Sequence, residues 1–224
     1  GYAELDGQVL TGKNAMRQAK IERIILGPKE GLAINNGATF SAAIGALAVF
    51  DAKYLTDLAD RSVAMTLEVL LGCSGAFDPR IHDARGQVGQ IQSAKMIKDS
   101  FSGSTFIDST DSVQDAYSLR CSPQIHGGVR DTVAFVKQVI EREINAATDN
   151  PLIFEPDIAI SGGNFHGEPI GLVMDYLSIA LCELGAISER RIFRMTDGKL
   201  NGGLPPMLVD SMDQAGLNSG LMML

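Results

Sequence analysis

Three long stretches of this chain repeat apolar residues every three or four positions, which is the spacing of one face of an α-helix. The first covers residues 38–71, and its stripe is Leu47, Phe50, Tyr54, Leu58, Met65 and Val69. The second starts with Ser122 as the expected N-cap and Pro123 at the first helical position, and stops before Thr148-Asp149-Asn150-Pro151. The third follows Pro169 and ends before Asp197-Gly198. These lengths predict an all-α fold, an elongated bundle of long helices.

The remaining segments give weaker structural signals. Residues 2–12 alternate around Asp6-Gly7 and predict a small N-terminal β-hairpin, and residues 152–160 form a short apolar piece interrupted by Pro156. A fourth, weaker helix is expected from Leu208 to the end. Because no internal repeat and no Gly-, Ser- or Pro-rich linker divides the sequence, we expect one helical domain over residues 1–224.

The composition narrows the classes of partner. Hydrophobic residues make up 45% of the chain and charged residues 21%, as in globular proteins, and the formal net charge of −8 argues against nucleic acid or an anionic membrane as a partner. The longest apolar run, residues 42–50, is far shorter than the roughly 20 residues of a membrane-spanning helix. Three widely spaced cysteines, Cys73, Cys121 and Cys182, indicate reduced thiols in a cytoplasmic protein.

The two ends of the sequence predict a piece of a longer protein. Residue 1 is Gly and not Met, and the apolar run Leu221-Met222-Met223-Leu224 stops without a polar tail. The alternative is a short protein whose last helix packs into a core.

Several common chemical motifs do not occur in the sequence. It contains no nucleotide-binding GxGxxG after a strand, no phosphate-binding GxxxxGK[ST] and no serine-hydrolase GxSxG. The three histidines, His82, His126 and His166, lack the spacing of metal ligands, so we expect no metal site.

The densest polar cluster covers residues 114–124. Gln114, Tyr117 and Arg120 recur every three positions, so in a helical turn they would share one side. That side would offer an amide, a phenol and a guanidinium, and a guanidinium can hold a carboxylate through two parallel hydrogen bonds. The alternative interpretation is an exposed turn with ordinary surface polarity.

Two further clusters leave both a functional and a structural interpretation open. Residues 161–169 contain paired glycines and Phe165, which could form the wall of a pocket or belong to a helix-entry loop. Asn35 and Asn36 precede Gly37 and could bind a ligand or cap the first long helix.

Together these clusters resemble the aromatic amino-acid ammonia-lyases. His166 and Cys121 favour the histidine-specific branch, because phenylalanine-specific members more often carry Gln and Thr at those positions. The matching stretches follow the family's order and cover nearly the whole chain: residues 27–33, Asn36-Gly37, residues 114–121 with Pro123-Gln124, Asp149-Asn150-Pro151, and residues 161–169 and 187–191.

The resemblance implies an enzyme of histidine degradation that eliminates ammonia from L-histidine to give trans-urocanate, as a cytoplasmic homotetramer. It implies the electrophile 4-methylideneimidazol-5-one (MIO), which forms from an internal Ala-Ser-Gly. Arg120 would grip the substrate carboxylate, and Tyr117 would lie beside the amino group. Asn36 and Gln114 would hydrogen-bond the MIO ring in a catalytic role, and Phe165 would form an apolar wall near ring and substrate.

The sequence also departs from the family pattern. No Ala-Ser-Gly occurs, and Cys73-Ser74-Gly75 and Ile160-Ser161-Gly162 do not lie where the family has its tripeptide. Ala38 stands in place of the usual Thr after Asn36-Gly37. We therefore expect residues 1–224 to be the central part of an ammonia-lyase, without its N-terminal MIO-forming part and its C-terminal part, and to be inactive alone. The alternatives are a tyrosine or phenylalanine ammonia-lyase or aminomutase of this family, or a non-catalytic helical scaffold subunit.

Overall fold

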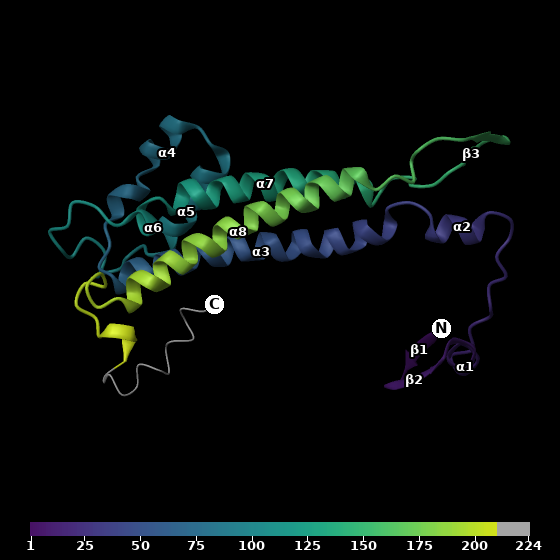
Figure 1. Ribbon diagram of the computed structural model, residues 1–224, viewed down its shortest axis with the longest axis horizontal. Helices are drawn as coiled ribbons and strands as arrows, with labels where there is room; N and C mark the ends of the chain where they lie inside the picture. Colours follow the sequence, from purple (N-terminus) through teal and green to yellow (C-terminus); the bar gives the residue numbers. More distant parts are fainter. Residues whose placement is uncertain (210–224) are drawn as a thin grey trace. The chain divides into compact units, whose positions relative to one another are not determined.

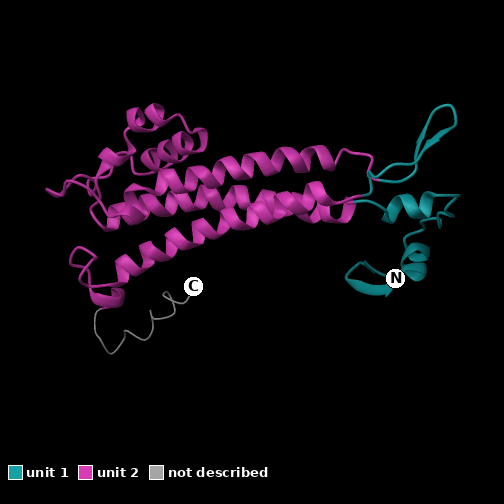
Figure 2. Ribbon diagram, turned by 45° about the horizontal axis from the view of Figure 1, so that its top comes forward, with its two compact units in different colours: residues 1–37, 149–165 teal, residues 38–148, 166–224 magenta. Residues whose placement is uncertain are grey.

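The computed structural model describes residues 1–209 and groups the chain into two compact units (Figure 2). Unit 1 consists of residues 1–37 and 149–165, and unit 2 of residues 38–148 together with the chain from residue 166 onward. The expectation of a single helical domain stays a prediction. The fourth helix, predicted from Leu208 to the end, lies outside the described residues except for its first two positions. The last described element is a short 3-10 turn at Pro206–Leu208.

In the described part of unit 2, three long helices form an elongated bundle (Figure 1). They are α3 (Thr39–Val69), α7 (Ser122–Glu143) and α8 (Glu168–Thr196), and each pair is in contact. The core between them is built from apolar side chains of all three, among them Val49, Ala52, Val133, Val136, Ile140, Val173 and Leu177. The predicted all-α bundle is therefore confirmed.

The apolar stripe that revealed α3 is largely exposed. Its large side chains, from Leu47 to Val69, are 47% to 73% exposed. The buried face carries mostly small residues, such as Ala42, Gly45 and Ala52. At Gly45 an added Cβ would lie 2.9 Å from Ile140 Cδ1 of α7, so the missing side chain lets the two helices approach closely.

The start of α7 differs in detail from the prediction. Its first residue is Ser122, preceded by Cys121, so Ser122 is not the N-cap. The Ser122 hydroxyl instead donates to the carbonyl of Ser118, at 3.1 Å. Pro123 still lies in the first turn, where a backbone N–H has no partner within the helix.

Short helices that the periodicity did not reveal gather at one end of the bundle (Figure 1). They are α4 (Pro79–Arg85), α5 (Val88–Ser100) and α6 (Tyr117–Arg120), with a 3-10 turn at Ser74–Phe77. Their apolar side chains share a second core with the end of α3, which contains Val63, Leu67, Phe77, Ile97 and Leu119. This core fixes the surroundings of α6.

Unit 1 contains both hairpins and two short helices. The antiparallel hairpin of β1 (Tyr2–Leu5) and β2 (Gln8–Thr11) turns at Asp6-Gly7, as predicted, and both turn residues have positive φ. The helices are α1 (Gly12–Gln18) and α2 (Glu30–Asn35). The apolar piece around Pro156 is a second hairpin, with β3 (Leu152–Phe154) and β4 (Ile158–Ile160).

By length and composition alone, residues 30–69 and 168–196 are long enough and apolar enough to cross a membrane. The core helices of bundles have the same composition. Here each of the two stretches buries a charged side chain against neighbouring helices, Asp60 in α3 and Arg191 in α8.

Candidate functional site

The single turn of α6 brings Tyr117 and Arg120 into contact. The guanidinium carbon of Arg120 lies 4.7 Å from the centroid of the Tyr117 ring, a cation–π distance. Tyr117 is 71% exposed, whereas Arg120 is partly buried and its Nε has no hydrogen-bond partner within the described chain. One face of the guanidinium therefore packs on the phenol ring, and the buried Nε–H of Arg120 remains available to a hydrogen-bond acceptor.

Gln114 does not belong to this turn. Ala116, with φ −62° and ψ 157°, is extended, so the helix begins only at Tyr117 and the predicted shared helical side is wrong for Gln114. Gln114 instead lines a cavity of about 390 Å³ with Asp115, Arg194 and Asn201. Burial raises the pKa of the Asp115 carboxyl, which accepts the Cys73 N–H at 2.7 Å.

In unit 1, Asn36 is held by Asp149. The Asn36 Nδ2 donates to Asp149 Oδ1 at 2.8 Å, and Lys29 pairs with the other carboxylate oxygen. Lys29, and then Asn36, lower the pKa of Asp149 to about 2. The suggested capping role is wrong, because α3 begins at Thr39 without a side-chain cap and Asn35 donates to Gly31 O within α2.

Phe165, also in unit 1, is partly exposed at the end of the loop that follows β4. Asn150 Oδ1 fixes the start of this loop by accepting from Ser161 Oγ and from the Gly162 N–H, at 3.1 and 2.7 Å. Of the five predicted site residues, the structure thus brings Tyr117 and Arg120 into contact. Gln114 lies in the preceding segment of unit 2, and Asn36 and Phe165 belong to unit 1.

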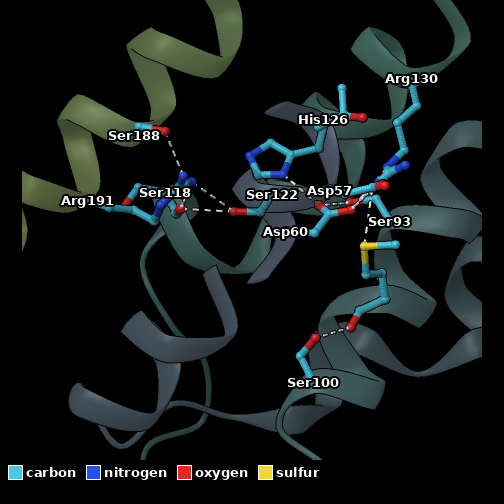
Figure 3. A network of polar contacts seen from close by, with 12 residues as sticks. Asp57, Asp60, Ser93, Ser100, Ser118, Ser122, His126, Arg130, Ser188 and Arg191 are labelled. Atoms are coloured by element: carbon cyan, nitrogen blue, oxygen red, sulfur yellow. Dashed lines mark hydrogen bonds and ion pairs between the residues drawn. The ribbon is translucent and has the colours of Figure 1, made fainter. Parts of the chain in front are cut away.

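A buried polar cluster in unit 2 was not predicted (Figure 3). Asp60 of α3 and His126 of α7 have no exposed surface, and His126 Nδ1 lies 2.7 Å from Asp60 Oδ1. Arg130 donates to Asp60 Oδ2 from Nε and Nη2, at 3.0 and 2.6 Å, and Ser93 donates to Oδ1. Burial lowers the pKa of His126, which favours its neutral form.

Figure 3 also shows Arg191 of α8, which is buried in unit 2. It is 2% exposed, and its guanidinium donates to the Ser118 carbonyl of α6 and to the hydroxyls of Ser122 and Ser188. The sequence signal that could have found this cluster is an acidic residue on a helix face without any other charged residue, since Asp60 shares the buried face of α3 with Val63 and Leu67.

Two expectations concern metals and cysteines. Across residues 1–209, no three His, Cys, Asp or Glu side chains gather in a group that could hold a metal ion. Cys73, Cys121 and Cys182 are all free thiols.

The sequence model of the family "Aromatic amino acid lyase" matches residues 1–224, the whole chain. This chain belongs to the aromatic amino acid lyase family. A histidine ammonia-lyase of Caldanaerobacter subterraneus subsp. tengcongensis is 50% identical over 225 residues, covering 99% of this chain and 44% of that protein. One from Treponema denticola is 46% identical with the same coverage.

Solved structures of the lyase family share the fold. The histidine ammonia-lyase of Trypanosoma cruzi superposes with a TM-score of 0.84 at 36% identity, over 100% of this chain and 44% of that one. The tyrosine aminomutase of Streptomyces globisporus gives a TM-score of 0.89 at 34% identity, over 97% of this chain and 47% of the other. The chain thus spans less than half the length of these relatives.

Proposed function

We propose that this chain is the central part of a longer enzyme that eliminates ammonia from L-histidine to give trans-urocanate. The observation that carries the proposal is the Tyr117–Arg120 pair on α6, where a guanidinium with an unpaired buried Nε lies against a phenol ring. The 50% identity to a histidine ammonia-lyase favours histidine as the substrate.

Arg120 is proposed to bind the substrate carboxylate. Within residues 1–209 none of the ion pairs includes Arg120, so its charge is available to a ligand. A planar guanidinium binds a carboxylate through two parallel hydrogen bonds and so fixes its orientation as well as its position. The contact with the Tyr117 ring keeps the guanidinium in place, so that it is already oriented to bind the carboxylate.

Tyr117 is proposed to act next to the carbon atoms that react. In an α-amino acid the amino group and the β-carbon are both bonded to the carbon that carries the carboxylate. Once Arg120 has bound the carboxylate, a residue in contact with Arg120 therefore lies close to the amino group and the β-carbon. The exposed Tyr117 hydroxyl is the group on α6 that can transfer a proton there. Loss of the β-proton leaves its electron pair to form the C=C bond, and the C–N electron pair departs with ammonia.

The residues of this chain fit the hydrogen-bonding surroundings of MIO, which resemblance to the family implies. Asn36 has its amide nitrogen fixed by Asp149, and Gln114 faces a cavity, so both amides are prepared to hold a polar ring. When formed, MIO supplies an electrophile that makes ammonia a better leaving group. Phe165 is proposed as the apolar wall near ring and substrate. Because these 224 residues contain no Ala-Ser-Gly, the electrophile must come from elsewhere in the protein.

The same proposal includes a cytoplasmic homotetramer. The stripe of large apolar side chains on α3 from Leu47 to Val69 is exposed, as are Leu172, Tyr176 and Ile179 of α8. Exposed apolar surface of this extent is typical of helices that pack against other subunits. We infer that these faces are buried between copies of the protein.

The test is the absorbance growth of urocanate when L-histidine is added to the purified full-length protein. Growth with L-histidine, and not with L-tyrosine or L-phenylalanine, supports the proposal. An unsaturated acid formed only from tyrosine or phenylalanine would assign the protein to a sister branch. The tyrosine aminomutase structure motivates a second candidate, an aminomutase, for which the product would be an isomeric amino acid and not an unsaturated acid. Absence of turnover with every one of these amino acids would support a non-catalytic scaffold.

A further inference from the structure

The α6 turn that carries Tyr117 and Arg120 depends on its neighbours. It contains four residues, and its hydrogen bonds run from the Leu119 and Arg120 N–H groups to Ala116 O and from Cys121 N–H to Tyr117 O. A single turn has no stability of its own in water, because nucleating a helix is unfavourable. Whatever packs against α6 therefore decides where its two functional side chains lie.

One buried guanidinium connects this turn to the bundle. Arg191 Nη1 lies 3.4 Å from Ser118 O and 3.4 Å from Ser122 Oγ, and Nη2 lies 2.9 Å from Ser188 Oγ (Figure 3). Ser118 stands between Tyr117 and Arg120, and the Ser122 hydroxyl also donates to its carbonyl. Arg191 thus joins the middle of α6 and the first residue of α7 to its own helix, α8.

The surroundings of Arg191 explain why this connection is stiff. Arg191 is 2% exposed, and it takes part in none of the ion pairs of the described chain. A buried cation is very unfavourable unless its donors are hydrogen-bonded. Burial lowers the pKa of Arg191 to about 10, against an opposing effect of Asp60, so the side chain stays protonated at neutral pH. Its donors must keep their three acceptors, which limits the movement of α6.

We propose that Arg191 is a positioning residue, which holds the Tyr117–Arg120 turn in its active geometry through Ser118 O and Ser122 Oγ. This inference deepens the function proposed above and rests on it for its catalytic part. Lysine cannot replace Arg191, because one ammonium nitrogen cannot stand where two separate guanidinium nitrogens donate in different directions.

The structural part is tested by hydrogen exchange on the full-length protein. In Arg191→Lys and Arg191→Met we expect the amides of residues 119–121 to exchange about tenfold faster, since the turn loses the buried guanidinium that contacts Ser118 O and Ser122 Oγ. The middle of α7, residues 132–140, should keep its protection. Arg190→Lys is the matched control, because Arg190 is exposed on the same helix and pairs with its neighbour Glu189. Unchanged exchange at residues 119–121, or an equal rise along the whole bundle, would overturn the proposal.

Ser122→Ala provides a milder variant in case the Arg191 variants do not fold. It removes one hydroxyl, and with it one acceptor of Arg191 and one donor to Ser118 O. We expect faster exchange at residues 119–121, by a smaller factor than in Arg191→Met. Wild-type exchange in this variant would count against the proposal.

The catalytic part is tested by kinetics with L-histidine. If Arg191 places Arg120 and Tyr117, Arg191→Lys should raise KM by about tenfold, because the carboxylate is bound less well, and should also lower kcat, because Tyr117 is displaced with the turn. A merely structural role would lower the active fraction, and therefore kcat, at unchanged KM. Failure of the wild-type protein to turn over any amino acid would refute the proposed function, whereas the exchange measurement would still decide whether Arg191 positions α6.

Discussion

His126 Nδ1 lies 2.7 Å from Asp60 Oδ1, and neither side chain has any surface exposed to solvent. Asp60 is also paired with Arg130, so its charge is balanced inside the protein. The hydrogen bonds of Asp60 with Ser93, His126 and Arg130 join α3, α5 and α7. Arg191 of α8 is hydrogen-bonded separately, to Ser118 of the turn that carries Tyr117 and Arg120.

Asp60→Asn should destabilise the protein strongly. It leaves Arg130 partly buried without its main counter-ion, and breaking one partner of a buried pair costs about 3–5 kcal/mol. Denaturant unfolding of the full-length protein measures the loss. Asp57→Asn is the control, because Asp57 is more exposed and its pair with Arg130 should contribute less than about 1 kcal/mol. Equal losses in the two variants would show that the burial of Asp60 has no special role.

The protein should lose stability as the pH falls from 7 towards 5. Burial lowers the pKa of both His126 and His82 in the folded state, so below about pH 6.5 the unfolded chain binds more protons than the folded one. Each histidine can contribute a slope of at most about 1.4 kcal/mol per pH unit. Unfolding free energies measured between pH 5 and 7 should show a slope that His126→Gln and His82→Gln each reduce. A flat profile would contradict this expectation.

Arg120→Lys should raise the KM for L-histidine by at least about tenfold, with a smaller effect on kcat. A lysine is a point charge and cannot form the two parallel hydrogen bonds of a guanidinium, so the carboxylate would be held loosely. It would also lose the planar contact with the Tyr117 ring. Steady-state kinetics of the full-length protein measure the change, and Arg80→Lys, at a surface pair with Asp78, is the control. An unchanged KM would argue against the carboxylate role.

Asp149→Leu should lower kcat by about tenfold, because it removes the oxygen that accepts from the amide of Asn36, which is proposed to hydrogen-bond the MIO ring. Lys29→Met removes the neighbouring ion pair and keeps the hydrogen bond from Asn36, so it separates the two roles of Asp149. We expect Lys29→Met to retain most of kcat. If both variants lose activity equally, the ion pair and not the amide is what matters.

The long helices were predictable because their local signals agree. Residues 39–69, 122–143 and 168–196 each carry an apolar period, and Pro and Gly stand near their ends. The short helices α4 and α5 were missed, although α4 has readable signals: Asp78 accepts the Arg80 N–H at its start, and Gly86 with φ 74° ends it. The seven residues of α4 are too few for periodicity to be recognised. The longer α5 buries mostly small and polar side chains, so its apolar period is weak.

The candidate site was predicted only in part, for physical reasons. A spacing of three suggested one helical face for Gln114, Tyr117 and Arg120, but extended Ala116 separates Gln114 from the turn. The pairing of Asp60 with His126 joins residues 66 positions apart. Such contacts depend on how helices cross, which a single sequence does not reveal. The exposed stripe of α3 shows the same limit, since periodicity predicts a helix and not which face it buries.

The close crossing of α5 and α7 gives a prediction with an internal control. A Cβ on Gly127 would lie 2.4 Å from the backbone nitrogen of Gln90, and one on Gly89 would lie 2.2 Å from Gly127 O. Gly127→Ala must therefore push the two helices apart and should destabilise the protein by about 1–3 kcal/mol or more. Gly128 has open space around its Cβ position in the same helix, so Gly128→Ala should be neutral or stabilising by up to about 1 kcal/mol. Denaturation midpoints of the two full-length variants make the comparison. Opposite signs would confirm that α5 and α7 touch at Gly127, and a harmless Gly127→Ala would mean that they do not.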